Sequence, residues 1–346
     1  MEKKASKLTR ILSLDGGGIR GIIPAQILVA LEKALQRESK NPEARIGDYF
    51  DLIAGTSTGG ILACIYLCPD PENPGKARFS AEDAVKFYMD HGSEIFFKPK
   101  FSFNLKWLVK EIYNSTPIET LLEKYFGETE LKDLIRPCLI SAYDVYESKA
   151  VFFTSHDSKK REGKNFYIKD VARATSAAPT YFEIANVTSK SGVDYPLIDG
   201  GVFANNPALC AYAEAREFTF SESKKKPQAE EMLIFSLGNG GNTRMKYEYD
   251  KVKKWGTVKW IRPLINIMMS GVDQTVDYQL KQIFQAENRE YQYIRMDPRL
   301  YNASVTMDDA SPDNLEALRE AGIRASEEDK NIKIIEKLAR LLIENN

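Results

Sequence analysis

A serine that could act as a nucleophile stands in the run Gly55-Thr56-Ser57-Thr58-Gly59. An apolar stretch from Phe50 to Ala54 precedes this run, and a second apolar stretch begins at Gly60. A strand, a G-x-S-x-G turn and a helix in that order are typical of a nucleophile elbow, whose sharp turn exposes the serine hydroxyl. Gly55 and Gly59 would tolerate unusual backbone angles and leave space for a substrate. The alternative for this motif alone is a glycine-rich helix start without chemistry.

A second glycine-rich turn follows the first apolar strand of the chain. It reads Asp15-Gly16-Gly17-Gly18-Ile19-Arg20-Gly21 and lies between that strand (10–14) and an amphipathic helix. Gly16, Gly18 and Gly21 spell G-x-G-x-x-G, which predicts dinucleotide binding in this setting. That hypothesis expects an acidic residue at the tip of the next strand, where the chain instead delivers its serine. A nucleotide- or dinucleotide-binding module without hydrolysis is therefore the alternative function.

The same turn could hold an anion instead of a nucleotide. Successive N–H groups of Gly16, Gly17 and Gly18, with the cation of Arg20 close by, would form a cradle for negative charge. Beside a nucleophilic serine, such a cradle is an oxyanion hole, which typically lowers an acyl-transfer barrier by several kcal/mol. A glycine-rich turn with no ligand is the third alternative.

A nucleophilic serine needs a base, and the chain offers few candidates. His91 and His156 are its only histidines; the first ends an amphipathic helix and the second lies in a hydrophilic turn. Both are predicted to be titratable surface residues, although folding could bring either of them to the serine. Asp199 ends an apolar stretch just before two glycines, so the sequence favours a pair of Ser57 with Asp199. Asp-Gly is also a common turn, which is the alternative for this carboxylate.

The elements that must position these residues alternate between strand and helix. Apolar strands are expected near 10–14, 50–54, 137–143 and 231–238, with amphipathic helices between them. This order predicts one α/β fold with a mostly parallel central sheet. No repeat or domain boundary is evident, so residues 1–346 are predicted to form a single domain. Its α/β core would span about 8–240, followed by a mainly helical part at about 241–346.

Composition excludes several classes of function. The chain is 43% hydrophobic and 28% charged with a net charge of -1, so it lacks the basic surplus expected of a protein that binds nucleic acid. Four cysteines lie among apolar neighbours and have no histidine at ligand spacing, which indicates reduced thiols and no metal site. They are Cys64, Cys68, Cys138 and Cys210. No cofactor is predicted.

Two segments combine aromatic and basic residues. They are 95–107 and 253–269. Rings that insert into lipid and cations that meet headgroups suit a membrane interface, so both segments are candidates for peripheral membrane contact. The alternatives are a loop packed on the core for the first and a helix laid across the core for the second. With no secretion signal at residues 1–5 and no long apolar run, the chain is predicted to be cytoplasmic.

Three motifs taken together resemble the patatin-like phospholipases. The glycine-rich turn after the first strand, the G-x-S-x-G run and Asp199-Gly200-Gly201 occur in the order and context of that family. The likeness covers nearly the whole chain and is greatest to plant patatins and their bacterial relatives. It extends through Ala177-Ala178-Pro179-Thr180-Tyr181-Phe182, Ala204-Asn205-Asn206-Pro207, Lys254-Trp255-Gly256 and Asp308-Asp309-Ala310-Ser311-Pro312. The resemblance disfavours the dinucleotide hypothesis.

This resemblance implies a patatin-like three-layer α/β/α fold and a lipid acyl hydrolase that uses a Ser–Asp dyad without calcium. Ser57 would attack the ester carbonyl, Asp199 would take its proton, and water would release the acyl-enzyme. The backbone of Gly16, Gly17 and Gly18 would hold the oxyanion, with Arg20 nearby. Substrates would be membrane phospholipids or glycolipids. The chain has Asp-Gly-Gly where many members have Asp-Gly-Ala, which leaves the acid in place.

The resemblance also suggests a regulated function. Some bacterial members of the family act in anti-phage signalling: a cyclic nucleotide activates them, and they then degrade membrane phospholipid. A regulatory site of that kind would lie in the residues after Gly240.

Overall fold

An eight-stranded sheet forms the centre of the computed structural model, which describes residues 7–97, 113–221, 224–240 and 247–346. The strand order is β10-β9-β1-β2-β3-β6-β5, and β4 pairs with β3 outside this path. The first five strands run parallel, whereas β4 and β6 are antiparallel to β3. The strands are β1 (Thr9–Leu14), β2 (Leu52–Thr56), β3 (Cys138–Asp144), β4 (Lys149–Thr154), β5 (Ala185–Thr188), β6 (Asp194–Asp199), β9 (Met232–Leu237) and β10 (Tyr293–Met296).

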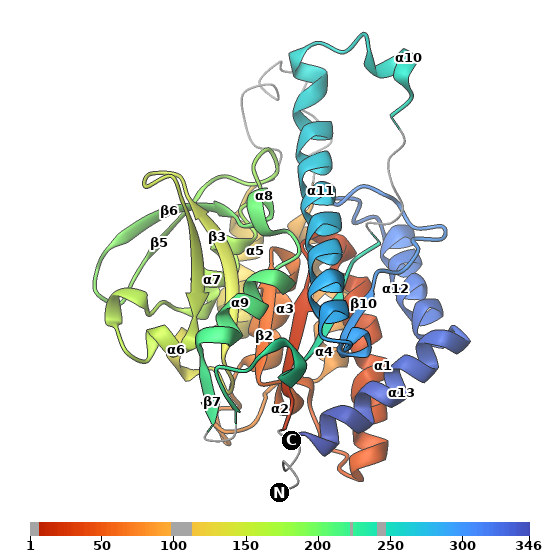
Figure 1. Ribbon diagram of the computed structural model, residues 1–346. Helices are drawn as coiled ribbons and strands as arrows, with labels where there is room; N and C mark the ends of the chain where they lie inside the picture. The colour runs from red at the N-terminus through yellow and green to blue at the C-terminus, as the bar shows by residue number, and fades with distance from the viewer. Residues whose placement is uncertain (1–6, 98–112, 222–223, 241–246) are drawn as a thin grey trace, which may run out of the picture.

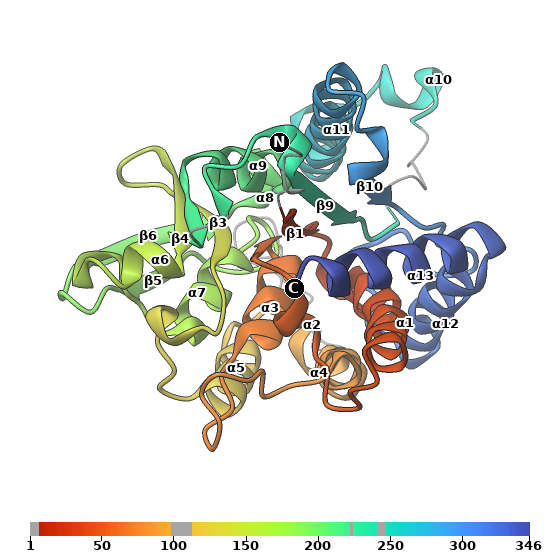
Figure 2. The ribbon, with the colours of Figure 1, turned by 60° about the horizontal axis from the view of Figure 1, so that its bottom comes forward.

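Helices cover both faces of the sheet (Figures 1 and 2). On one face lie α1 (Ile22–Ser39), α3 (Thr58–Leu67), α4 (Ala81–Ile95), α5 (Thr116–Phe126), α7 (Ile168–Thr175), α12 (Pro312–Glu327) and α13 (Asp329–Glu344). On the other face lie α9 (Ala208–Glu217) and α11 (Thr257–Ala286). The predicted three-layer α/β/α fold with a mostly parallel sheet is confirmed.

Successive side chains of each strand point to opposite faces of the sheet, so the core has two parts, one on each face. In β1, Leu12 and Leu14 pack with the α1 side, whereas Ile11 packs with the α9 and α11 side. Both sets are fully buried, because a parallel sheet with helices on each face has no wet side. α3 is buried along its whole length, as expected for a helix that is apolar all round.

The remaining short elements connect these layers. They are α2 (Ile46–Tyr49), α6 (Ser155–Ser158), α8 (Gly201–Ala204), α10 (Tyr249–Val252), a two-stranded hairpin of β7 (Thr219–Ser221) with β8 (Lys224–Lys225), and 3₁₀ turns at Gly18–Gly21, Leu131–Asp133, Glu162–Lys164, Ala229–Glu231 and Glu290–Gln292. β10, from the C-terminal third, extends the sheet by pairing with β9. No helix in the described ranges combines the length and the apolar character needed to cross a bilayer.

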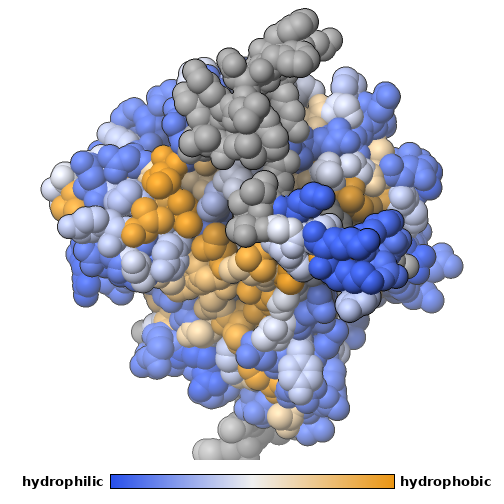
Figure 3. Space-filling model, turned by 90° about the horizontal axis from the view of Figure 1, so that it is seen from above, coloured by the Kyte–Doolittle hydropathy of each residue, from blue (hydrophilic) through white to orange (hydrophobic). Residues whose placement is uncertain are grey.

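β1 and β2 both end at the upper edge of the sheet in Figure 1. The glycine-rich turn follows β1 and the serine follows β2, so parallel pairing of these strands brings the two motifs together at this edge. Figure 3 looks down on the same end of the molecule and shows apolar surface gathered near its centre. Most of the predicted segment 95–107 lies outside the described residues, since 98–112 are not among them.

Candidate active site

Ser57 occupies the turn between β2 and α3. Its φ of 56° lies in the left-handed region, which a non-glycine residue adopts only when its surroundings enforce it. The carbonyl of Ser57 accepts the N–H groups of Gly60 and Ile61 in α3, and its own N–H donates to Thr175 Oγ1 at 2.9 Å. A Cβ at Gly55 would overlap the backbone of Gly59, and a Cβ at Gly59 would overlap the carbonyl of Leu14. The elbow therefore requires both predicted glycines for close approach of the backbone.

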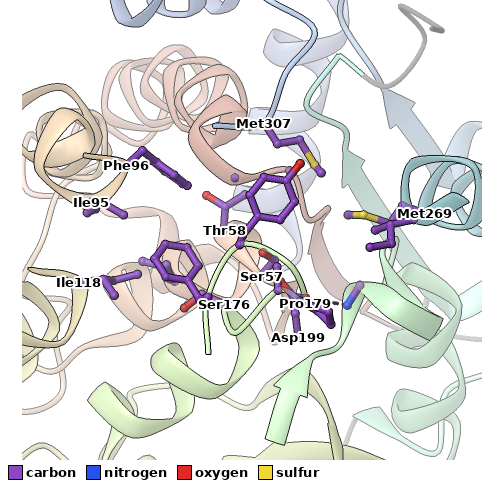
Figure 4. A pocket seen from close by; sticks show the side chains of 18 of the residues that line it. Ser57, Thr58, Ile95, Phe96, Ile118, Ser176, Pro179, Asp199, Met269 and Met307 are labelled. Carbon is purple, nitrogen blue, oxygen red and sulfur yellow. Dashed lines mark hydrogen bonds between the residues drawn. The ribbon is translucent and has the colours of Figure 1, made fainter. Parts of the chain in front are cut away.

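Asp199 is the last residue of β6 and is buried beside Ser57 (Figure 4). The two residues meet because β3 lies between their strands: Thr56 pairs with Ser141, and Asp199 pairs with Ala142. The carboxylate accepts the N–H of Gly201 at 2.7 Å and lines the same pocket as Ser57. The sheet thus brings together Ser57 and Asp199, which are more than a hundred residues apart in the sequence.

Burial controls the protonation of Asp199. Desolvation raises the pKa of this carboxyl from 3.8 to about 7, and hydrogen bonds from Ser57 and the Gly201 N–H only partly oppose the shift. No cation from the described part of the chain contributes to this balance. A carboxyl with this pKa is a much stronger base than an exposed aspartate and can both take and return a proton near neutral pH.

The glycine turn after β1 is held tightly against the elbow. The N–H of Gly16 donates to the carbonyl of Asn205 at 3.0 Å, and the carbonyl of Gly16 accepts from the side chain of Asn239. Gly16 therefore has no free N–H to offer a ligand. Gly17 and Gly18 line the pocket beside Ser57, and no described residue accepts a hydrogen bond from either N–H group. Gly18 has φ +60° and lies directly against the backbone of Met307.

Asp15 anchors the same turn from below. Its carboxylate forms two hydrogen bonds with the Arg295 guanidinium of β10, at 2.9 and 2.5 Å. Arg295 also donates to Ser236 on β9, at 2.8 Å. Burial raises the pKa of Asp15 to about 6, and the guanidinium opposes that shift, so the carboxylate is ionised at neutral pH. The turn is thus fixed to two neighbouring strands.

Arg20 lies outside the pocket that contains Ser57. It lines an adjoining cavity of about 480 Å³ whose walls are mixed polar and apolar, and its guanidinium makes only long hydrogen bonds, 3.4 Å each, to the carbonyls of Gly17 and Val305. Within the described chain this guanidinium forms no ion pair with a carboxylate. Desolvation lowers the pKa of Arg20, and the charges of Asp297 and Asp273 oppose that shift. A half-buried guanidinium without a carboxylate partner is suited to an anionic ligand.

The pocket above Ser57 and Asp199 has apolar walls. α4 supplies Phe87, Tyr88 and Ile95, the segment after α7 supplies Pro179 and Phe182, and α11 supplies Ile265 and Met269. Figure 4 shows several of these side chains around the serine. Neither histidine of the chain lines the pocket.

Both histidines are engaged elsewhere. His156 Nε2 lies 2.6 Å from Glu214 Oε1, and its ring packs on Phe218. The prediction that His156 is a surface residue is wrong, because these two contacts bury it. His91 stands 3.6 Å from the carboxylate of Glu94 and is partly buried. The hypothesis that folding brings a histidine to the serine therefore finds no support.

Comparison with known proteins agrees with this architecture. The family model described as "Patatin-like phospholipase" matches residues 12–212, a range that contains the glycine turn, the elbow and Asp199. The chain belongs to the patatin-like phospholipase family. Its similarity to individual members extends beyond the range of the family model and reaches into the C-terminal helices.

Three relatives in this family illustrate the similarity, and all three are plant proteins. "Patatin-like protein 2" of Oryza sativa subsp. indica is 33% identical over 339 residues, covering 91% of this chain and 83% of that protein. "Patatin-like protein 1" of Arabidopsis thaliana is 35% identical over 336 residues, covering 91% and 80%. "Probable inactive patatin-3-Kuras 1" of Solanum tuberosum is 34% identical over 327 residues, covering 91% and 86%. Family membership supports lipid acyl hydrolase activity, and since one relative is named inactive, the specific reaction has to be argued from this chain's own site.

Several residues that shape the patatin-like site were missed by reasoning from the sequence. Thr175 binds the N–H of Ser57, Asn239 holds the glycine turn, and Arg295 pairs with Asp15. Asn239 follows β9, which is the parallel neighbour of β1, so its position at the same sheet edge was predictable once the strand order was known. Thr175 carries no such signal, because it ends a helix and no motif includes it.

Proposed function

We propose that this chain hydrolyses fatty acyl esters of membrane phospholipids, with Ser57 as nucleophile and Asp199 as general base. The observation that carries the proposal is that Ser57 stands beside the buried carboxyl of Asp199, which has a raised pKa, in one apolar pocket. Ser57 stands on a strained elbow at a helix N-terminus, a place that favours developing negative charge.

The proposed reaction has two halves. The Ser57 oxygen attacks the acyl carbonyl while its proton passes to Asp199, and the new oxyanion accepts hydrogen bonds from the N–H groups of Gly17 and Gly18. The alcohol departs with the proton held by Asp199, leaving an ester of Ser57. Water then attacks this ester, gives its proton to Asp199, and the fatty acid leaves as the proton returns to the serine. No imidazole is needed at any step.

The surroundings of the site favour a phospholipid among acyl lipids. Apolar walls from three elements suit an acyl chain, whereas the adjoining cavity presents Arg20, with Asp273 and Asp308 also on its walls. A phosphodiester headgroup bound there would pair with the half-buried Arg20 cation, which a neutral glycolipid headgroup cannot do. We therefore assign Arg20 to the headgroup and to the electrostatic field behind the glycine turn rather than to direct contact with the oxyanion.

Purified wild type, Ser57→Ala and Asp199→Asn are compared on mixed vesicles by a lipidomic readout of released fatty acid. Each variant should lose at least about a thousandfold in rate, because residues that act as one unit fail together. Asp194→Asn, at the other and exposed end of β6, is the matched control and should keep full activity. Fatty acid release by Ser57→Ala at the wild-type rate would refute the dyad.

Two further arms of this experiment address the substrate and its regulation. A phospholipid should be cleaved faster than a galactolipid with the same acyl chains, and the opposite order would remove Arg20 from headgroup recognition. The role of a cyclic-nucleotide-activated anti-phage effector stays a prediction. Beyond residue 240, a cavity of about 1090 Å³ with mixed charge lies between α11, β10 and α13. Repeating the assay with a panel of cyclic dinucleotides tests that role, and indifference to all of them counts against it.

A further inference from the structure

The first third of α11 projects beyond the rest of the described chain at the sheet edge that carries the site (Figure 1). Together with α10, it forms a segment that we call the α11 tip, residues 247–269. This segment has three properties that a helix packed only on its own core does not need: clustered aromatic rings, surplus positive charge and exposed aliphatic side chains.

The aromatic rings lie around the start of α11. Tyr247 and Trp255 meet edge to face with ring centroids 5.7 Å apart, and Trp255 meets Trp260 in the same way at 5.2 Å. All three are only partly buried. Tryptophan and tyrosine rings of this kind settle at the headgroup level of a bilayer, where an apolar ring and a polar edge are both satisfied.

The charge of the tip complements an anionic surface. Residues 247–269 contain five lysines or arginines against two acidic residues, in a chain whose net charge is -1. Lys251 and Lys253 pair with the two acids. Lys254 and Lys259 are exposed, and within the described ranges neither forms an ion pair. These two lysines are therefore available to lipid phosphates.

The aliphatic side chains of the tip divide between two faces of one helix. Leu264 and Met268 are 49% and 47% exposed, and four residues of separation place them on the same outward face. Ile265 and Met269, one residue further along, are turned by about 100° and line the pocket above Ser57. The outward face is thus continuous with the wall of the acyl pocket.

We propose that the α11 tip docks on the surface of a bilayer that contains anionic phospholipid. Leu264, Met268 and the tryptophans enter the boundary between headgroups and acyl chains, while Lys254 and Lys259 bind lipid phosphates. The tip lies on the membrane surface and holds the pocket mouth against it, so that an acyl ester reaches Ser57 without crossing water. This inference rests on the proposed function, since it assigns the surface that delivers the substrate.

Binding is measured with the full chain carrying Ser57→Ala, so that lipid is not consumed. The protein is sedimented with phosphatidylcholine vesicles, with and without phosphatidylglycerol. Binding should require phosphatidylglycerol, and Lys254→Glu with Lys259→Glu should weaken it at least about tenfold. Leu264→Ser with Met268→Ser should weaken it to a similar degree. Tyr278→Ser is the matched control: it lies on the same helix, about 21 Å from Leu264, is 64% exposed, and should bind as its parent does.

The same substitutions in active protein separate docking from chemistry. On a soluble short-chain ester, both double variants should keep the wild-type rate, whereas on vesicles they should lose at least about tenfold. Vesicle binding that is unchanged in both double variants overturns the proposal. A difference in oligomeric state between the parent protein and the double variants, measured by sedimentation velocity, also overturns it, because the face would then bind a second copy of the chain. Absence of soluble-ester hydrolysis by wild type, with vesicle binding intact, would refute the proposed function and leave the docking surface standing.

Discussion

Ser57 and Asp199 each have a conformation or an environment that costs free energy. A non-glycine residue in the left-handed region costs on the order of 1–3 kcal/mol, and Ser57 has a φ of 56°. Asp199 is 3% exposed and has no cation facing it within the described chain. Both costs fall on two residues that lie side by side in one pocket. Local strain and an unpaired buried carboxyl at the same point are the combination expected of a working site rather than of a structural turn.

The raised pKa of Asp199 predicts the pH dependence of the rate. Asp199 must be ionised to accept the proton of Ser57, and burial raises its pKa to about 7. On a soluble ester, kcat/KM should therefore fall about tenfold per pH unit below that value and level off above it. A profile that is flat from about pH 5 to 8 would contradict the assignment of Asp199 as base.

Stability should respond to pH in the opposite sense. Between the unfolded pKa of about 4 and the folded value of about 7, only the folded carboxyl holds a proton. Its contribution to stability is therefore greatest at low pH and is lost as pH rises through this window. Asp199→Asn removes the titration, and its urea midpoint should lack that part of the decline.

Residue types were easier to predict than their exact tasks. The G-x-S-x-G and Asp-Gly patterns predicted a pair of Ser57 with Asp199, and the structure places these two residues side by side, while their catalytic roles stay a prediction. The oxyanion donors were predicted as three glycines, yet the N–H of Gly16 is bound by Asn205. Which N–H group is free depends on a loop almost two hundred residues away. No local pattern carries that information.

At the scale of elements, β10 connects the C-terminal third to the site. Its Arg295 reaches across β9 to Asp15, at the start of the glycine turn. The sequence predicts the strands of the α/β core, since continuous apolar runs mark buried parallel strands. It missed β10 because only four residues form it and an arginine stands in its middle. Arg295 makes this strand hard to predict from the sequence, and the same residue fixes the glycine turn.

Arg295 is therefore a positioning residue for the proposed oxyanion donors. Arg295→Met should lower kcat on a soluble ester by about 10- to 100-fold with little change in KM, because the glycine turn loses its anchor. It should also destabilise the fold by about 3–5 kcal/mol, since Asp15 is left buried and unpaired. Arg295→Lys should restore part of kcat. A loss of stability with kcat unchanged in the folded fraction would make the ion pair purely structural.

α11 shows how far periodicity alone can lead. The sequence left residues 253–269 as either an interfacial element or a helix on the core, and the structure places one 30-residue helix there. Its lower half packs on the sheet through Leu280 and Phe284, whereas Leu264 and Met268 remain exposed. The lower half of α11 is therefore a helix packed on the core. Membrane contact by its upper half stays a prediction.

At the scale of the whole molecule, a buried charge cluster joins the two ends of the chain. Asp51, just before β2, accepts hydrogen bonds from Arg10 on β1 at 2.9 Å and from Lys224 on β8 at 2.7 Å. Arg10 also donates to the carbonyl of Leu342 in α13. This cluster lies at the starts of β1 and β2, whereas the glycine turn and Ser57 follow the ends of these strands. This charge cluster holds the two ends of the chain together and takes no part in the proposed reaction.

Removing Asp51 should therefore cost stability and spare catalysis. Burial raises the pKa of Asp51, but the hydrogen bonds and charges of Arg10 and Lys224 outweigh it, so the pKa lies below its ordinary value. Asp51→Asn leaves two buried cations unpaired and should lower the free energy of unfolding at neutral pH by about 3–5 kcal/mol, measured with urea. The difference should shrink as pH falls below the unfolded pKa, because wild type then protonates Asp51.

Glu217→Gln, which breaks the exposed pair with Lys226, should change stability by less than about 1 kcal/mol. A comparable loss in both variants, or a fall in kcat of Asp51→Asn on a soluble ester, would show that the two ends of the sheet are not independent.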